Sequence, residues 1–142
     1  MENFICKIKY EKVQENGTTK KVTEQYIVDA LSFTEAEKRI IDEMKAFISG
    51  DFEVADISKV DYSEIMLSDK VEDDKYYNVK IEITELTDNG NEKKIPYLIS
   101  VLASNIDTAK KYFDKGMEGS MMDYNVVSIK ETKIMDYYKY KE

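Results

Sequence analysis

The 142-residue sequence contains no histidine, no tryptophan, a single cysteine and a single proline. Histidine is the commonest general base and a frequent metal ligand, so its absence removes imidazole triads and most transition-metal sites. One cysteine, Cys6, cannot form an intrachain disulfide or a thiolate cluster. The five glycines do not have the spacing of a phosphate-binding loop. We therefore expect a protein that is not an enzyme, with no catalytic residues, no cofactor and no metal site.

Long apolar stretches are also missing. No segment approaches the length of a membrane-spanning helix, and the first ten residues, MENFICKIKY, lack the apolar region of a signal peptide. The net charge of −8 opposes non-specific binding to nucleic acids and anionic membranes, because both are polyanions. Arg39 is the only arginine, so the chain has only one side chain suited to bidentate recognition of phosphate. We expect a cytoplasmic protein with no membrane partner.

The sequence does contain an internal repeat. The segment ENGTTKK (15–21) recurs as DNGNEKK (88–94), and DFEVADI (51–57) recurs as DYNVVSI (123–129). A weaker match pairs EIM (64–66) with KIM (133–135). Because the matches cluster at turn, strand and helix positions, a duplicated unit is the most economical explanation.

Each copy has the pattern of two strands, a helix and a third strand. Apolar and polar residues alternate before and after Asn16-Gly17 and Asn89-Gly90, which predicts two hairpins with type I′ turns. Ser32 and Asn105 are suited to cap the helices that follow. The predicted fold is α+β: two tandem ββαβ repeats packed as one pseudo-twofold-symmetric domain, with six strands in a mainly antiparallel sheet and two helices.

The boundaries follow from the repeat. We predict a single domain over residues 1–142, with one repeat over residues 4–67 and the other over residues 76–140. The acidic segment SDKVEDDK (68–75) has no apolar periodicity and is interpreted as the linker between them.

The first hairpin is rich in lysine, and most of these side chains are expected to share its solvent side. Lysines beside aromatic residues on a sheet are typical of single-strand nucleic-acid binders, but lysines also protect exposed strands from edge-to-edge pairing. The second interpretation is favoured, since residues 77–96 of the second repeat are slightly acidic. The candidate lysines are Lys7, Lys9, Lys12, Lys20 and Lys21.

Tyrosines are concentrated at the C-terminal end, in the segment DYYKYK (136–141). Tyr137, Tyr138 and Tyr140 are therefore candidates for an interaction surface, because tyrosine is enriched in protein interfaces. The equal alternative is a last strand that packs alternate tyrosines on the core.

Two segments, KKVTEQYIVDALSFTEAEKRIIDEM (20–44) and FISGDFEV (47–54), carry a family resemblance. They are similar to an uncharacterised domain family of gut Bacteroidetes and their phages, including crAss-like phages. The likeness spans most of the chain and is strongest over residues 4–66. It implies a bacterial or phage cytoplasmic setting and an accessory role, and it supplies no catalytic residues.

Three hypotheses about function remain at this point. The first is a non-enzymatic interaction protein that binds a protein partner or self-associates. The second is a single-stranded nucleic-acid binder that uses the basic first hairpin. The third is a small-molecule or nucleotide binder at the interface of the two repeats.

Overall fold

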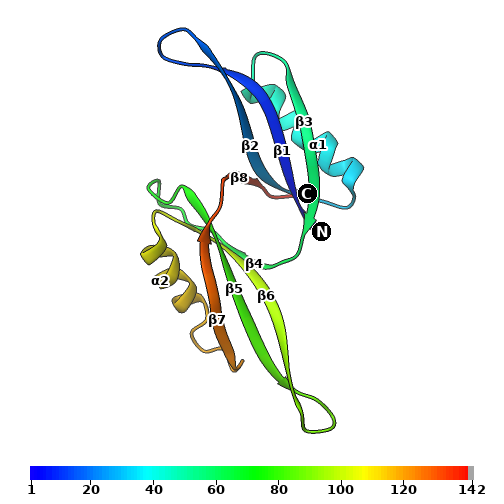
Figure 1. The fold of residues 1–142 in the computed structure, drawn as a ribbon, viewed down its shortest axis with the longest axis vertical. Helices are drawn as coiled ribbons and strands as arrows, with labels where there is room; N and C mark the ends of the chain where they lie inside the picture. Colours follow the sequence, from blue (N-terminus) through cyan, green and yellow to red (C-terminus); the bar gives the residue numbers. More distant parts are fainter. Residues whose placement is uncertain (141–142) are drawn as a thin grey trace. The chain divides into compact units, whose positions relative to one another are not determined.

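The computed structural model describes residues 1–140, which form eight strands and two helices (Figure 1). In chain order the elements are β1 (Glu2–Val13), β2 (Thr19–Ala30), α1 (Phe33–Phe47), β3 (Phe52–Val60), β4 (Tyr62–Met66), β5 (Lys75–Leu86), β6 (Glu92–Ala103), α2 (Ile106–Gly116), β7 (Tyr124–Glu131) and β8 (Ile134–Tyr138). The chain divides into two compact units: Met1–Asp61 with the segment from Ile134 onwards, and Tyr62–Lys133.

Each unit contains one four-stranded sheet. The strand order is β3-β1-β2-β8 in the first unit and β4-β6-β5-β7 in the second. Neighbouring strands are antiparallel except for β2 with β8 and β4 with β6, which are parallel. The predicted α+β class, the two helices and the mainly antiparallel pairing are confirmed. The expectation of six strands in one sheet was wrong, because each repeat ends in an additional short strand.

These short strands are exchanged between the repeats. In the first unit, the strand at the edge next to β2 runs parallel to β2. It is therefore also parallel to β3, which lies at the opposite edge of the same sheet. A parallel connection needs about a dozen residues, but only Asp61 separates β3 from β4. The first repeat therefore cannot complete its own sheet. β4 joins β6 in the second unit, and β8 joins β2 in the first unit.

The compact units consequently differ from the sequence repeats. The chain passes from the first unit to the second after Asp61 and returns after Lys133. Residues 68–75, which were interpreted as the linker, lie within the second unit and connect β4 to β5. They still join the two sequence repeats, because β4 is the last strand of the first repeat and β5 is the first strand of the second.

The core of the first unit lies between its sheet and α1. Alternate residues of β1, including Phe4, Cys6 and Ile8, are fully buried against Ile40 and Met44 of the helix. The helix begins after Ser32, whose Oγ accepts a hydrogen bond from the Glu35 amide at 3.1 Å. This confirms the predicted N-cap and satisfies one of the amides that the first turn leaves unpaired.

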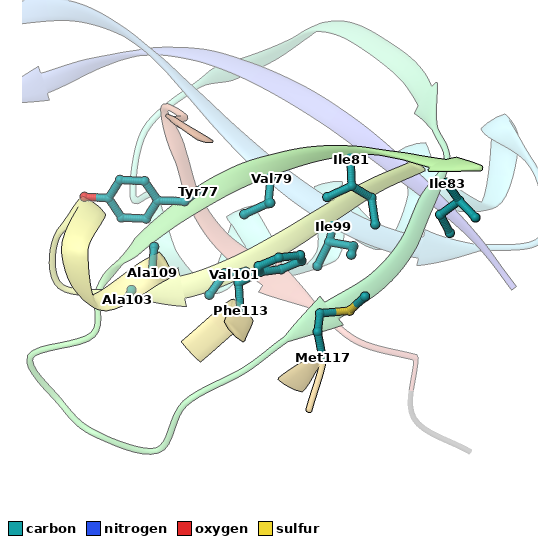
Figure 2. Close-up of a cluster of buried hydrophobic side chains, with 10 residues drawn as sticks. All are labelled: Tyr77, Val79, Ile81, Ile83, Ile99, Val101, Ala103, Ala109, Phe113 and Met117. Atoms are coloured by element: carbon teal, nitrogen blue, oxygen red, sulfur yellow. The ribbon is translucent and has the colours of Figure 1, made fainter. Parts of the chain in front are cut away.

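The second unit repeats this arrangement with different side chains. Figure 2 shows its core, in which Phe113 of α2 packs among β-branched residues of β5 and β6. Asn105 caps α2 by accepting a hydrogen bond from the Thr108 amide at 2.8 Å. Met66, from the exchanged strand β4, packs against the same core.

The two hairpin turns differ from the predicted type. A type I′ turn needs positive φ at both central residues, whereas only Gly17 (φ +83°) and Gly90 (φ +80°) are positive, and their asparagines are not. The Gly17 amide donates to the Gln14 carbonyl at 3.0 Å, so the turn is a three-residue loop that ends in left-handed glycine. Asn16 stays at negative φ, with its side-chain oxygen accepting from the Thr18 amide at 3.1 Å.

Candidate interaction surfaces

The lysines of the first hairpin lie on both faces of the sheet. Cys6 and Ile8 face α1, so Lys7 and Lys9, which alternate with them, lie on the opposite face. Lys21 pairs with Glu11 in the β1–β2 register and shares that face. The structure therefore brings together three of the five predicted lysines.

Each lysine on the helix-free face lies opposite a carboxylate. In the strand register, Lys7 faces Asp56 and Lys9 faces Glu53, both of β3, while Lys21 faces Glu11. Directly opposed side chains have Cβ atoms about 5 Å apart, and opposite charges at that distance stabilise a sheet. This face is electrically balanced, which lowers the support for a nucleic-acid surface. The carboxylates of β3 lie far away in sequence, so the local charge of the hairpin could not reveal them.

Lys12 and Lys20 form a separate pair on the other face. They oppose one another across β1 and β2 at the end of the hairpin, where both are exposed. Two like charges in this position weaken the local pairing. Their arrangement suits protection of an exposed strand end, and a role in ligand binding stays a prediction.

A concavity of about 590 Å³ lies between the first hairpin and the start of β3. Tyr10 and Phe52 supply its aromatic rings, and burial, followed by a hydrogen bond to Glu24, raises the pKa of Tyr10 to about 12. Its charged lining is Lys9, Lys21, Glu11, Asp51 and Glu53. Because carboxylates outnumber amines there, this concavity does not favour a phosphate.

The C-terminal tyrosines hold β8 on the first unit. The ring of Tyr138 stacks on that of Tyr26 at 5.6 Å, and burial raises the pKa of Tyr138 to about 12. The Tyr137 hydroxyl donates to Asp29 Oδ2 at 2.6 Å. Two of the three predicted tyrosines therefore have packing and hydrogen-bonding roles within the unit.

Tyr140 completes this attachment. Its backbone amide donates to Asp29 Oδ2 at 3.2 Å, and its ring lies 5.3 Å from the Arg39 guanidinium. Arg39 also donates to the Lys139 carbonyl at 3.2 Å and to the Asp29 carbonyl. The only arginine of the chain is thus occupied in fastening the C-terminal strand. An interface role for these tyrosines stays a prediction.

Asp73 is the best-connected acidic residue of segment 68–75. It is buried, and its Oδ2 accepts hydrogen bonds from Ser68 Oγ and from the Tyr112 hydroxyl of α2. These two hydrogen bonds lower the pKa of Asp73 and fasten the segment to the second unit.

Cys6 has no features of a reactive thiol. It is fully buried under α1, and burial raises the pKa of its thiol to about 12. The thiolate is the nucleophilic form, so Cys6 is best described as a small apolar core residue.

The sequence did not indicate a short segment with four exposed apolar side chains, which we call the β7 surface: Met121, Met122, Val126 and Val127. Met121 is 98% exposed, and the other three side chains are between 41% and 49% exposed. Val127 is unpaired in the β5–β7 register, which marks a bulge on this edge strand.

The corresponding residues of the first repeat are Ser49, Gly50, Val54 and Ala55. The second repeat thus has larger apolar side chains at three of the four positions. It also replaces Glu53 and Asp56 of β3 by Asn125 and Ser128. A position-by-position comparison of the two repeats would have revealed this surface.

Within residues 1–140, no cluster of three or more histidine, cysteine, aspartate or glutamate side chains is arranged to hold a metal ion. None of the helices described is long and apolar enough to cross a membrane.

The fold defines a class of protein: two α+β units, each a ββαβ arrangement completed by a strand from the other repeat. The chain belongs to the family described as Domain of unknown function (DUF4494), whose model matches residues 2–140. The predicted membership of an uncharacterised domain family is confirmed at that level. A comparison with curated proteins finds no match, and a comparison with solved structures finds none.

Proposed function

We propose that this protein is a non-enzymatic interaction protein that binds a protein partner through the β7 surface. The observation that supports this proposal is the exposure of Met121, Met122, Val126 and Val127 within one short segment. Fully burying an exposed apolar side chain contributes about 1.5–3 kcal/mol. Met121 can contribute in this range, and the other three side chains, which are 41–49% exposed, can each contribute a part of it. Methionine is flexible and polarisable, which suits contact with an irregular partner surface.

The contrast between the repeats strengthens the argument. Both edge strands carry a bulge at the same position, and a bulge protects an edge from continuous strand pairing. In the first repeat the carboxylates of Glu53 and Asp56 flank the bulge, whereas in the second repeat the uncharged Asn125 and Ser128 take their places beside Val126 and Val127. We infer that the partner contacts side chains of this surface and does not extend the sheet by a long strand.

The proposed setting is the cytoplasm of a bacterium, or of a host cell if the protein is encoded by a phage. It rests on the resemblance of residues 20–44 and 47–54 to the family of gut Bacteroidetes and their phages.

The test uses a variant that gives the second repeat the residues of the first: Met121→Ser, Met122→Gly and Val127→Ala together. In a pull-down from a Bacteroidetes lysate, the wild-type protein should retain a partner. Alternatively, light scattering should show that the wild-type protein self-associates. The triple variant should bind at least tenfold more weakly, since about 1.4 kcal/mol corresponds to a factor of ten.

A matched control is Val13→Ser in the first hairpin, which removes an exposed apolar side chain outside the β7 surface. It should leave binding unchanged. The proposal is contradicted if the wild-type protein is monomeric and retains no partner, or if the control and the triple variant reduce binding equally.

A further inference from the structure

The first unit has a binding place for a strand that its own repeat cannot supply. β8 occupies this place through a parallel register in which Gln25, Tyr26, Ile27 and Val28 face four residues of β8. Because the connection geometry prevents β4 from reaching it, the place must be filled by a strand from elsewhere. We propose that two copies of this chain exchange their β8 strands, so that the first unit of each molecule is completed by β8 of the other.

The contacts that bind β8 do not depend on which molecule supplies it. Ile134 is 6% exposed, Tyr138 stacks on Tyr26, and Tyr137 and Tyr140 donate hydrogen bonds to Asp29. An identical β8 from a second molecule makes the same contacts. The exchanged and unexchanged forms therefore differ mainly in the cost of association and in the connection that precedes β8.

That connection has a defined pivot. Thr132 is fixed to the second unit, since its amide and its hydroxyl both donate to the Tyr76 carbonyl, at 2.9 Å and 2.7 Å. Only Lys133 lies between this anchor and the start of β8. β8 can leave the first unit by rotation about this position while β7 and the second unit stay folded.

Opening leaves groups that require a new partner strand. The Asp29 carboxylate loses two donors, and the rings and side chains of Tyr26 and Val28 lose their cover. Such an opened chain is unstable unless a second β8 binds. A short tether gives an effective concentration of about a millimolar, so the monomer dominates in dilute solution and the exchanged dimer forms near that concentration. This inference does not depend on the β7 surface.

The test mixes ¹⁵N-labelled and unlabelled full-length chains at about a millimolar, under reducing conditions and with mild urea. The urea is then removed, and the products are diluted and weighed by native mass spectrometry. We expect a dimer of intermediate mass that persists on dilution, because its dissociation requires a second opening.

Two variants of neighbouring residues provide the comparison. Ile134→Asp places a charge on a buried anchor of β8, whereas Met135→Asp changes a residue that is 53% exposed. The mixed dimer should fall at least tenfold in the Ile134→Asp chain and be retained in the Met135→Asp chain. Circular dichroism verifies that both variants are folded.

A peptide of residues 133–140 gives a second measurement on the wild-type chain alone. In excess, it should occupy the opened first unit and suppress the mixed dimer, while a scrambled peptide should not. The inference is overturned if no mixed dimer forms, if the Ile134→Asp chain forms it at the wild-type level, or if the peptide has no effect.

Discussion

At the scale of single residues, the buried carboxylate of Asp29 connects three segments of the first unit. It is 6% exposed and accepts hydrogen bonds from Asn3 Nδ2 at 2.7 Å, from the Tyr137 hydroxyl and from the Tyr140 amide. Buried hydrogen bonds to a charged group stabilise a protein more than neutral ones, and unpaired donors left behind are costly.

We predict that Asp29→Ala lowers the free energy of unfolding of the first unit by about 3 kcal/mol, because it leaves two side-chain donors without their acceptor. Tyr137→Phe removes one of these hydrogen bonds and should cost about 1.5 kcal/mol. Urea denaturation measures both values. As a control, Ser58→Ala at an exposed position of β3 should stay within about 0.5 kcal/mol of the wild type. Equal stability of all three variants would contradict the assigned role of Asp29.

The glycines of the chain allow a second comparison at this scale. Gly17 has φ +83°, and a Cβ added there would meet nothing within 4 Å, so any cost of a side chain comes from the backbone alone. Gly17→Ala should therefore lower the free energy of unfolding by about 1–2 kcal/mol, the usual penalty of a left-handed conformation. Melting temperature reports the change.

Gly50 serves as the matched control, because it also has open space at Cβ but no positive φ. Gly50→Ala should leave stability unchanged or raise it by about 0.5 kcal/mol through the reduced entropy of the unfolded chain. If both substitutions shifted the melting temperature equally, the turn geometry would not be the cause.

At the scale of elements, the segment between β4 and β5 is fastened to α2 through Asp73. Hydrogen bonds from Ser68 and Tyr112 lower the pKa of Asp73, so the folded state binds its proton less readily than the unfolded state. The resulting stabilisation is present above the unfolded pKa, about 3.9, and is lost as the pH falls through the lower folded value.

We predict that acidification from about pH 7 to about pH 3, across the aspartate range, destabilises the second unit less in the Asp73→Asn chain than in the wild type. Urea denaturation at both pH values measures this difference. Asp69→Asn, an exposed substitution in the same segment, should retain the wild-type dependence. If the stability of the Asp73→Asn chain depended on pH as strongly as that of the wild type, other carboxylates would be responsible for the pH dependence.

The elements also show which features local sequence determines. Hairpins and helix starts were predictable, since Asn-Gly and the capping residues Ser32 and Asn105 act within a few residues of themselves. The single proline, Pro96, has no amide to donate to a neighbouring strand. It lies in β6 where no donor is needed on the second side, because β4 begins to pair with β6 only at Leu98.

Features that depend on distant pairing were not predictable. β4 and β8 have only five residues each and no clear alternation, and their parallel partners lie in the other repeat. The weak match of residues 64–66 with 133–135 was their only sequence signal. The carboxylates opposite Lys7 and Lys9 were hidden for the same reason, because a strand register follows from the assembled sheet.

At the scale of the whole molecule, each structural unit contains strands from both sequence repeats, because the two short strands are exchanged. β8 is the last strand of the second repeat but completes the first unit, and β4 is the last strand of the first repeat but completes the second unit. A change at one end of the sequence should therefore affect the unit formed mainly by the other repeat.

We predict that a chain truncated after Lys133 loses hydrogen-exchange protection in β2, at Gln25–Val28, whereas β5 and α2 retain theirs. The reason is that β2 loses its neighbour, while every strand of the second sheet remains. The reciprocal variant Met66→Asp introduces a charge beside the core of the second unit and should reduce protection in β6 and α2 alone. Exchange followed by mass spectrometry resolves both units in one experiment. If the truncation instead exposed the amides of β5 and β6, the two units would not be completed by strand exchange.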